Sequence, residues 1–514
     1  MPLGLHKHGD DHRRMSLGRK SADEGSADVA TGDDETVVEP DQGNVLSHII
    51  SQLRPGADLN KVTLPTFILE PKSMLERITN FMAHPETLLP MPEIEDPTQR
   101  FLSVVKFYLS GWHIKPPGVK KPLNPILGET FTCYWDYPDH TRGYYISEQT
   151  SHHPPKSSYF FMAPEHNIRI DGALKPRGKF LGNSAASLME GVGVLRFMNR
   201  GKTRGGERYF LTQPNMYARG ILFGKMKYEL GDHSFIKCPE NGLMADIEFK
   251  TKGYFGGTYN AIGGNIKNEK TGETLFELSG MWSGEMVLKD VRTGHKEVLF
   301  NASHAKHTVP TVRPIEEQDE RESQRLWLKT VKAIKESNHI AATEEKSKVE
   351  DRQRDETAKR AEQGIEWQPK LFRQVRGGPG GPEEGEEDLD WILNANIDGA
   401  TSDEKTKQIL ALAPILRGPQ QNQQSETFQP QHSQHTSQLP SRPQQQTAGH
   451  DDLIDFGQSN PVPATSAPVG HADPMRFQPN VPPGMQAPLQ PGYPIKRVDT
   501  KTKDLDEFVD APGY

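Results

Sequence analysis

The sequence predicts a β-rich α+β protein whose folded domain is a large, mostly antiparallel barrel. Three observations point to it. From Phe131 onward, short stretches rich in β-branched and aromatic residues follow one another, with turn residues about every 8–12 positions. Apolar residues at helical spacing are confined to the start and the end of the same region. Many antiparallel strands in one domain must close on themselves or be covered, because open edges aggregate.

The composition predicts one folded domain between two unstructured arms. Only 34% of the 514 residues are hydrophobic, and the net charge is −8. Positions 1–43 are polar and charged, whereas positions 376–514 contain a Gly/Pro hinge and a Gln/Pro-rich tract. Such segments bury too little apolar surface to fold. We therefore expect disordered arms at 1–43 and 376–514 and a folded domain at 44–375.

Several classes of protein are disfavoured at this point. No run of about 18 apolar residues occurs, so no membrane-spanning helix is expected. The N-terminal sequence MPLGLHKHGDDHRRMS lacks the apolar stretch of a secretory leader. The two cysteines, Cys133 and Cys238, cannot form a disulfide framework and lack the neighbours of a zinc site. A reducing, cytosolic compartment fits, and the mild acidity argues against non-specific binding of nucleic acid.

Helices are expected at both ends of the domain. Asn44 can cap a first helix, which Pro55-Gly56 ends. A second helical stretch covers 74–82, and a third begins at Asp96-Pro97 and runs to Gly111. The charged stretch 316–363 predicts one or two surface helices. The first helix carries one apolar face, made of Val45, Leu46, Ile49, Ile50 and Leu53.

The strands are expected between these helices. The segment WQPKLF at 367–372 places a tryptophan and a phenylalanine beside a proline, which favours docking of the domain's end. Strand-like stretches lie at 141–149, 157–163, 207–214, 216–224, 226–231, 233–238, 244–251 and 275–290.

The most unusual motif is EQTSHHPP at 148–155. Pro154 restricts His153 to an extended conformation, and the two prolines end the strand because they cannot donate ladder hydrogen bonds. Both imidazoles, His152 and His153, then project from a rigid rim and can donate hydrogen bonds to an anion. The alternative is a structural turn whose histidines only cap strand ends. A metal site is a weaker alternative, because no Cys, Asp or Glu stands at ligand spacing.

A second motif, KKPLNPILGE at 120–129, predicts a rigid loop that leads into a strand. Lys121 and Asn124 could present a cation and an amide to a phosphate group. The alternative is that Lys121 is simply a solvated surface charge.

These motifs together resemble a known family. EQTSHHPP resembles the signature of the oxysterol-binding-protein-related lipid transfer proteins, KKPLNPILGETF resembles the second hallmark of that family, and WQPKLF resembles its C-terminal signature. The three matches occur in order and span most of residues 59–375. The resemblance implies an incomplete antiparallel barrel of about nineteen strands around a lipid-sized tunnel. It also implies a helical lid, at 44–58 in this chain, and lipid ligands instead of a cofactor or metal.

The resemblance further implies a headgroup site. Family members exchange lipids between membranes, and many bind phosphatidylinositol 4-phosphate at a basic entrance. Carried over to this chain, the contacts are Lys121, Asn124, His152 and His153. A basic residue of the helix after the barrel is also expected, with Arg325 as the best match and Arg321 one turn earlier. The chain keeps only Glu322-Ser-Gln-Arg325 of the longer motif found there in many relatives.

The second lipid is suggested by LPTFILE at 64–70, which resembles LPxFILE in the phosphatidylserine-carrying branch of the family. Leu64, Phe67, Ile68 and Leu69 would then line the tunnel, and Ser184 would help to bind the serine headgroup. The lid would close through Leu46, Ile49, Ile50 and Leu53. The alternatives are that LPTFILE is only a buried strand, or that the protein carries or senses sterol and phosphatidylinositol 4-phosphate with the same fold.

The C-terminal sequence DLDEFVDA resembles an FFAT motif, by which lipid carriers dock on VAP receptors of the endoplasmic reticulum. The matching residues are Glu507, Phe508, Asp510 and Ala511, whereas Val509 and Gly513 depart from the motif. No Gly-x-Ser-x-Gly elbow, phosphate loop, dinucleotide fingerprint or HExxH helix occurs, so no enzyme is expected. We therefore expect a lipid exchanger that binds membranes peripherally and transiently where the endoplasmic reticulum meets the plasma membrane.

Overall fold

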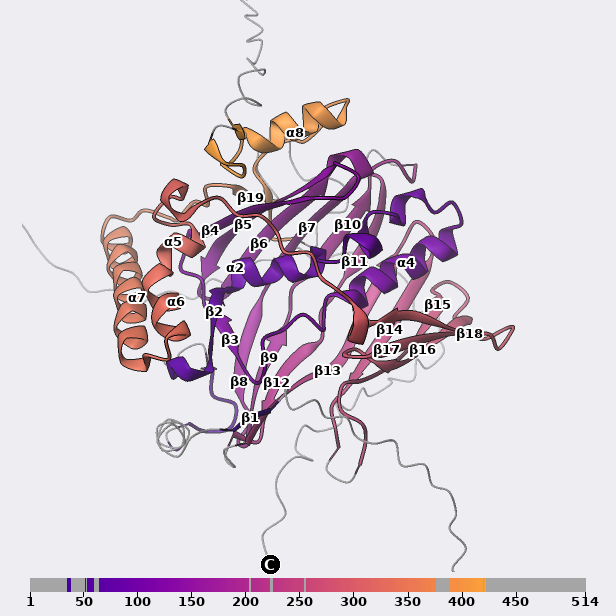
Figure 1. The fold of residues 1–514 in the computed structure, drawn as a ribbon, viewed down its shortest axis with the longest axis horizontal. Helices are drawn as coiled ribbons and strands as arrows, with labels where there is room; N and C mark the ends of the chain where they lie inside the picture. Colours follow the sequence, from indigo (N-terminus) through magenta and orange to yellow (C-terminus); the bar gives the residue numbers. More distant parts are fainter. Residues whose placement is uncertain are drawn as a thin grey trace, which may run out of the picture. The chain divides into compact units, whose positions relative to one another are not determined.

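The computed structural model describes residues 35–37, 51, 53–59, 64–202, 205–221, 225–253, 256–375, 389–418 and 420–421 (Figure 1). The folded part extends further than the expected 44–375 at both ends. A short strand at 35–37 lies within the expected N-terminal arm, and a strand and a helix lie between 389 and 410. Composition does not reveal this second extension, because the apolar residues that seat it are few and lie within a tract that is polar on average.

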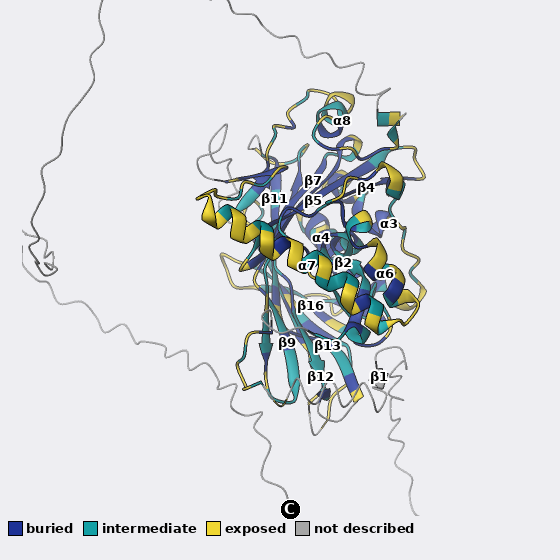
Figure 2. Cartoon of the chain, turned by 90° about the vertical axis from the view of Figure 1, so that its left-hand side faces the viewer, coloured by how far each residue is buried: buried dark blue, intermediate teal, exposed yellow. Residues whose placement is uncertain are grey.

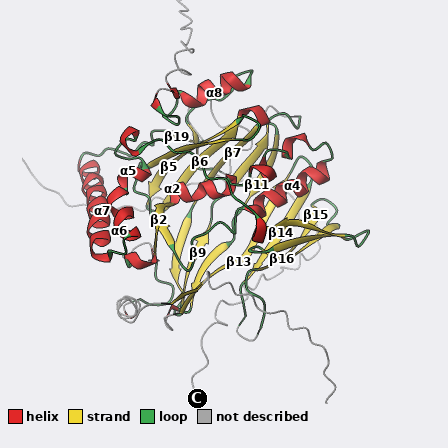
Figure 3. Cartoon of the chain, in the orientation of Figure 1, coloured by secondary structure: helices red, strands yellow, loops and turns green. Residues whose placement is uncertain are grey.

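The strands form one dominant antiparallel sheet (Figures 1 and 3). Sixteen strands of the described residues belong to it, and its main path runs from β18 through β13 to β4, with β1, β8, β9 and β12 as a side branch. The strands of this sheet are β1 (Glu35–Val37), β4 (Thr130–Asp136), β5 (Arg142–His152), β6 (Pro155–Ala163), β7 (Ile168–Leu174), β8 (Pro176–Phe180), β9 (Ser184–Met189), β10 (Gly193–Phe197), β11 (Glu207–Leu211), β12 (Asn215–Arg219), β13 (Lys225–Cys238), β14 (Leu243–Lys250), β15 (Ala261–Asn268), β16 (Thr274–Met281), β17 (Glu285–Asp290) and β18 (Lys296–Asn301).

The two ends of this path, β18 and β4, do not pair with each other, so the barrel is incomplete as expected. The free edge of β4 is covered instead by the chain that follows the barrel. The amide of Thr130 donates to the carbonyl of Arg321, and Tyr134 exchanges two hydrogen bonds with Thr311. Covering an edge in this way protects it from pairing with another chain.

Two further pairs of strands lie outside the main sheet. The parallel pair β2 (Leu69–Ser73) and β3 (Lys121–Leu123) brings the LPTFILE segment beside the KKPLNP loop. The antiparallel pair β19 (Phe372–Gln374) and β20 (Trp391–Leu393) joins the C-terminal signature to the extension.

The described α-helices precede and follow the strands of this sheet in the sequence, between residues 74 and 110 and between residues 323 and 410. The expected helix at 97–111 is confirmed as α4 (Pro97–Ser110), and the carboxylate of Asp96 accepts the amide of Gln99 at 2.8 Å. The expected stretch 74–82 divides into α2 (Met74–Arg77) and a 3₁₀ helix, Ile78–Met82. The remaining α-helices are α3 (Pro85–Leu88), α5 (Ser323–Leu326), α6 (Leu328–Lys335), α7 (His339–Glu362) and α8 (Ser402–Leu410).

The largest core lies between α4 and the sheet. Buried apolar side chains of α4, among them Phe101, Val105 and Leu109, pack in one cluster with residues of β4–β7 and β13–β17. Arg100 of α4 also forms two hydrogen bonds with the buried carboxylate of Glu207 on β11, at 2.7 and 2.8 Å. By contrast, α7 is mostly exposed and is buried only along one side (Figure 2).

The histidine pair His84 and His113 lies next to Phe300 of β18. From this pair we expect the stability of the protein to depend on pH. Nε2 of His84 and Nε2 of His113 are 2.8 Å apart. Burial, and then the charges of His84 and His307, lower the pKa of His113 from 6.5 to about 4. Between these two pH values the unfolded chain binds more protons than the folded chain, so stability falls as the pH falls. For this histidine we expect a loss on the order of 1–2 kcal/mol from pH 7.5 to pH 5.

Urea unfolding at the two pH values measures this loss. His113→Gln keeps a hydrogen-bonding side chain but does not titrate, so it should reduce the difference by that amount. His295→Gln, at an exposed histidine, should leave the difference as in the wild type. An equal difference in all three proteins would contradict the assignment.

Candidate lipid and headgroup site

One cavity joins an apolar wall to a polar rim. Its volume is about 180 Å³, taken as the space open to the centres of water molecules. The polar part of its lining, here called the rim, includes Lys121, Asn124 and the buried Gln149, from the two hallmark motifs. The apolar wall is built from the segments 53–59, 64–68 and 119–125, from strands β8, β9, β12 and β13, and from Met74 and Ile221. Its apolar side chains are Leu53, Leu59, Leu64, Ile68, Met74, Val119, Phe180, Met216, Ile221, Met226 and Tyr228.

The structure divides the residues predicted to line the tunnel. Leu64 and Ile68 line the cavity, whereas Phe67 and Leu69 are not part of its lining. Phe67 packs beside the cavity, with its ring 6.2 Å from that of His339. Leu69 is buried in a separate cluster with Leu123, Ile126 and Trp327. The segment LPTFILE therefore contributes to both a cavity wall and a core.

Of the described residues predicted for the serine headgroup and the lid, only Leu53 lines the cavity. Ser184 is half-buried at the start of β9 and does not line the cavity, although Ala185, Ala186 and Ser187 do. Leu53, from the end of the expected lid, lines the cavity. The segment 54–59 that follows pairs with β8 through hydrogen bonds between the backbones of Gly56, Ala57 and Phe180. Leu46, Ile49 and Ile50 lie outside the described residues.

The KKPLNPILGE loop is held rigidly behind the cavity. Gly128 has φ of +74°, and a Cβ at this position would lie 2.5 Å from the ring of Trp367, so the loop and the C-terminal signature pack closely. The amide of Leu127 donates to Oε1 of Gln353 on α7 at 2.8 Å. Nζ of Lys120 donates to the carbonyl of Phe67 at 2.7 Å. Both lysines line the cavity, and the ammonium group of Lys120 is held by this hydrogen bond.

Glu129 anchors this loop to three other segments. Its carboxylate is fully buried and accepts hydrogen bonds from Ser73 Oγ (2.5 Å), Ser323 Oγ (2.6 Å), Trp327 Nε1 (2.9 Å) and the amide of Ile126 (3.1 Å). Burial raises the pKa of Glu129, and the three side-chain donors oppose that rise. One carboxylate thus joins β2, the loop, α5 and Trp327, the residue between α5 and α6.

The charged side chains of α7 affect the pKa of Lys121. Its side chain is half-buried, and burial lowers its pKa. The charge of Lys346 lowers this pKa further, whereas Glu350 and Asp58 raise it. Lys346 and Glu350 form an ion pair of 2.5 Å on α7. Charged groups of α7 therefore act on Lys121 of β3, which lines the cavity.

The two histidines occupy the end of β5. Along this strand, Tyr145, Ser147 and Gln149 alternate with Tyr144, Ile146 and Glu148, and the register shifts between Gln149 and Ser151, just before the histidines. Such a bulge re-aims the side chains that follow it. His152 is half-buried and His153 is exposed, with ring centroids 4.5 Å apart. The His153–Pro154 peptide bond is cis.

The contacts of His152 connect both hallmark motifs with α7. Nδ1 of His152 is buried and has no hydrogen-bond partner among the described residues. Burial and the neighbouring His153 lower the pKa of His152, while a hydrogen bond with the backbone of Pro125 and the charge of Glu350 raise it. Arg354 acts in the same direction as His153. The groups that act on the imidazole of His152 therefore come from both hallmark motifs and from α7.

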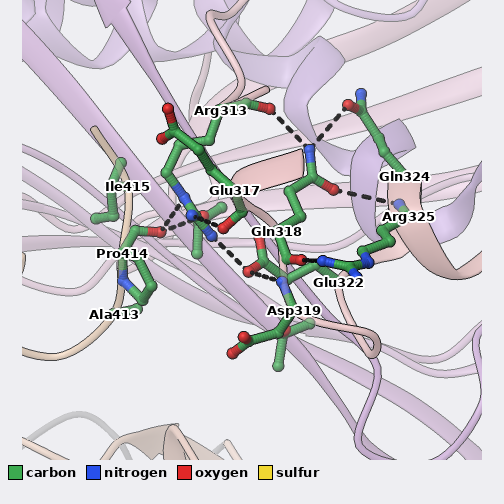
Figure 4. A network of polar contacts seen from close by, with 12 residues as sticks. Arg313, Glu317, Gln318, Asp319, Glu322, Gln324, Arg325, Ala413, Pro414 and Ile415 are labelled. Atoms are coloured by element: carbon green, nitrogen blue, oxygen red, sulfur yellow. Dashed lines mark hydrogen bonds and ion pairs between the residues drawn. The ribbon is translucent and has the colours of Figure 1, made fainter. Parts of the chain in front are cut away.

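The two arginines expected from the helix after the barrel lie apart. Arg321 donates to the carbonyl of Leu127 at 2.8 Å and forms an ion pair with Glu356 of α7, so it contacts the hallmark loop. Arg325 is exposed, and its amide and guanidinium donate hydrogen bonds to Gln318 (Figure 4). The hydrogen bonds of Arg325 thus run to Gln318 and not to the histidines.

Three charged groups of α7 that no sequence motif indicated act on Lys121 and His152 instead: Lys346, Glu350 and Arg354. Lys346 and Arg354 both lie within ion-pair distance of Glu350. They follow one another at four-residue intervals, so they share one side of the helix. That spacing was the available signal. It is hard to distinguish in a helix of mostly charged residues.

The C-terminal signature was expected to dock the end of the domain, and in the structure it docks on the histidine motif. Both carboxylate oxygens of buried Glu148 accept backbone amides, from Lys370 at 2.8 Å and from Leu371 at 2.7 Å. Burial raises the pKa of Glu148, and these hydrogen bonds oppose the rise. The first residue of EQTSHHPP therefore holds WQPKLF in place.

Within the described residues, no cluster of three or more His, Cys, Asp or Glu side chains has the arrangement of a metal site. None of the described helices is long and apolar enough to cross a membrane.

Comparison with known proteins identifies the class to which this fold and site belong. Residues 48–333 and 329–400 match the family model described as oxysterol-binding protein. Oxysterol-binding protein homolog 7 of Saccharomyces cerevisiae is 52% identical over 380 residues, which cover 73% of this chain and 84% of the relative. Homolog 6 of the same yeast is 50% identical over 421 residues, covering 80% and 92%. The Osh1 ORD domain solved with ergosterol has a TM-score of 0.54 at 25% identity and covers 66% of this chain and 86% of that one.

The chain belongs to the oxysterol-binding protein family. Its fold is the lipid-binding fold of that family, and the family assignment made from EQTSHHPP, KKPLNPILGETF and WQPKLF is confirmed.

Proposed function

We propose that this protein exchanges phosphatidylserine for phosphatidylinositol 4-phosphate between the endoplasmic reticulum and the plasma membrane. It carries one lipid at a time and returns it intact, without an enzymatic step. The observation that carries the proposal is the cavity whose wall is apolar and whose lining includes Lys121 and Asn124. Charges of α7 act on Lys121 of this lining and on the neighbouring histidine motif.

The charges of the rim support a phosphorylated headgroup. Lys121, His152, Lys346 and Arg354 gather cationic or protonatable groups around one carboxylate, Glu350. Burial and neighbouring cations lower the pKa values of Lys121 and His152: Lys346 acts on Lys121, and His153 and Arg354 act on His152. Both groups would therefore gain from an incoming anion. A phosphate supplies several acceptor oxygens. Once His152 is protonated, one of these oxygens can accept a hydrogen bond from its buried Nδ1.

The apolar wall supports an acyl-chain cargo. A diacyl lipid carries roughly 30 methylenes, and exposing them to water would cost some 25 kcal/mol at about 0.8 kcal/mol each. The cavity walls must offer equivalent surface during transit. Because Lys121 and Asn124 line the same cavity as Leu64 and Ile68, two lipids compete for it. Transport then follows the gradient of whichever lipid is maintained elsewhere.

The cargo is assigned to phosphatidylserine from the LPTFILE segment, of which Leu64 and Ile68 line the cavity. A sterol is the second candidate, and one observation favours it. A smaller cavity of about 50 Å³ shares Met74, Met216 and Tyr228 with the first, and Gln213 lies in its wall. Oε1 of Gln213 is buried without a hydrogen-bond partner among the described residues. It could therefore accept a hydrogen bond from the hydroxyl group of a sterol. A sterol carrier or sensor would use this group.

Contact with membranes and receptors is part of the same proposal. We expect transient, peripheral binding to membrane surfaces, with the 44–58 segment as lid. The motif around Glu507, Phe508, Asp510 and Ala511 would dock on a VAP-type receptor of the endoplasmic reticulum. Most of the lid and this motif lie outside the described residues.

Transfer between two vesicle populations tests the proposal. Donor vesicles contain phosphatidylcholine with fluorescent phosphatidylserine, and acceptor vesicles contain phosphatidylcholine with or without phosphatidylinositol 4-phosphate. We expect phosphatidylserine transfer to accelerate when the acceptor contains the phosphoinositide. If phosphatidylserine stays in the donor while a labelled sterol moves, the cargo assignment is wrong and the sterol candidate takes its place.

A further inference from the structure

The C-terminal extension, described at residues 389–418 and 420–421, packs on the side of the sheet that faces away from the cavity; we call it the strap. It consists of β20, α8 and the residues after α8 (Figure 1). The matches to the family model end at residue 400, so α8 and the residues after it lie beyond them. None of the strap residues lines the cavity described above.

The strap packs on the outer side of the strands that carry the histidine motif. Along β5, Tyr144 and Ile146 face the strap, whereas Tyr145 lies in the core between the sheet and α4 and Gln149 lines the cavity. On β6, Phe160 and Met162 face the strap. The apolar side chains that the strap contributes are Leu393, Ile397, Ile409, Leu410, Ala413, Ile415 and Leu416.

A first polar tie leads from the strap to the histidine turn. Oδ2 of Asp390 lies 2.6 Å from Nζ of Lys156 and 2.9 Å from Nζ of Lys175. Lys156 directly follows Pro155, which is paired with His152 in the β5–β6 hairpin. Burial raises the pKa of Asp390, but its hydrogen bonds with the two lysines outweigh this and lower the pKa. The strap thus holds the lysine next to the turn.

A second tie runs through the C-terminal signature. The amide of Asn394 donates to the carbonyl of Leu371 at 2.8 Å, and β20 pairs with β19. The amide of Leu371 in turn binds the carboxylate of Glu148, four residues before His152 on β5. This chain of hydrogen bonds connects the strap with the base of the histidine motif.

A third tie reaches the segment that leads to α7. The carbonyl of Pro414 accepts hydrogen bonds from Thr132 Oγ1 at 2.8 Å and from Arg313 Nε at 3.1 Å (Figure 4). The buried guanidinium of Arg313 also donates to Glu322 Oε1 and to the carbonyl of Glu317. Glu322 precedes Ser323, whose hydroxyl donates to Glu129 behind the hallmark loop.

We propose that the strap is a positioning element of the headgroup site. It fixes from outside the β5–β6 turn that carries His152 and His153, together with the 313–325 segment that precedes α7. It thereby sets affinity for the phosphorylated headgroup without contacting the lipid. This inference rests on the headgroup site proposed above, and it adds residues 401–421 to the parts of the chain that determine the affinity of that site.

Two mild substitutions loosen the strap without exposing its apolar seat. Asp390→Asn removes the charge that holds Lys156 and Lys175, and Thr132→Val removes one donor to Pro414. Asp403→Asn is the matched control, because Asp403 is exposed in the first turn of α8. Leu410→Asp is a stronger change that unseats α8. If that variant does not fold, the Asp390→Asn/Thr132→Val double variant still decides the question.

Each protein is mixed with phosphatidylcholine vesicles that contain phosphatidylinositol 4-phosphate, and separately with vesicles that contain fluorescent phosphatidylserine. In the double variant we expect extraction of the phosphoinositide to fall roughly tenfold, as for the loss of two hydrogen-bonded ties. Extraction of phosphatidylserine should stay near the wild-type value. A parallel fall for both lipids would mean that the strap only stabilises the fold, and no fall for either would equally overturn the proposal.

Hydrogen exchange separates this inference from the proposed function. In the double variant, amides at 148–156 and 318–326 should exchange faster, while those of β14–β16 should be unchanged. If the wild type extracts no phosphoinositide, the proposed headgroup site is wrong. The exchange rates at 148–156 and 318–326 still show whether the strap positions these segments. Unchanged exchange at 148–156 would reject the strap's role whatever the lipids do.

Discussion

Replacing His152 and His153 together with alanine is expected to abolish the transfer of phosphatidylinositol 4-phosphate. The pair stands beside Pro125, Glu350 and Arg354, and Nδ1 of His152 is buried without a partner among the described residues. Hydrogen bonds to a charged group contribute about 1.5–3 kcal/mol each, so the loss of two should lower affinity at least about a hundredfold. Initial transfer rates between vesicles measure it.

The matched control for this change is the His295→Ala/His304→Ala double variant, because both of these histidines are exposed next to the ends of β18. It should transfer the phosphoinositide at the wild-type rate. If the His152/His153 variant also keeps that rate, the two imidazoles are structural caps of the strand end, as the alternative interpretation of the motif holds.

Leu64→Asp is expected to abolish extraction of every lipid. Leu64 is half-buried in the cavity wall, and a lipid that filled the cavity would cover a carboxylate at this position. Removing an unpaired carboxylate from water costs several kcal/mol. Extraction of both phosphatidylserine and phosphatidylinositol 4-phosphate should therefore fall at least about a hundredfold. Sedimentation of vesicles, with the extracted lipid measured in the supernatant, reports it.

Leu181→Asp makes the same substitution at a leucine that is 39% exposed, next to β8 and outside the cavity lining. This variant should extract both lipids normally. Selective loss of phosphatidylserine in Leu64→Asp, with the phosphoinositide unaffected, would show that the two lipids do not share this wall and would remove the basis for competition.

Sequence patterns predicted the parts of the site that depend on local backbone chemistry. The prolines around Asn124 and after His153 define rigid loops from sequence alone, and both loops meet at the cavity. The parts contributed by distant segments were harder to predict. Lys346 and Arg354 lie on a helix whose sequence is charged on most sides, so only the fold selects the side that faces Lys121.

The same difference explains the other corrections. Phe67 and Leu69 are as apolar as Leu64 and Ile68, and which of them reach the cavity depends on the short 3₁₀ turn, Thr66–Ile68, and on the pairing of β2 with β3. The average composition of the strap is polar, which predicts disorder. Its ordering depends on a few apolar residues, such as Ile409 and Leu416, that fit against β5 and β6.

The four donors around Glu129 also determine when the site can form during synthesis. Ser73 precedes Glu129 by 56 residues, but Ser323 and Trp327 follow it by 194 and 198. A nascent chain that ends within the barrel therefore leaves this carboxylate short of partners and the edge of β4 uncovered, and such exposed edges favour aggregation. The wall behind the headgroup is among the last parts to fold, because non-local contacts wait for the distant segment. A translation pause or a truncation before α5 would therefore yield a sheet with an exposed edge and an unfinished site.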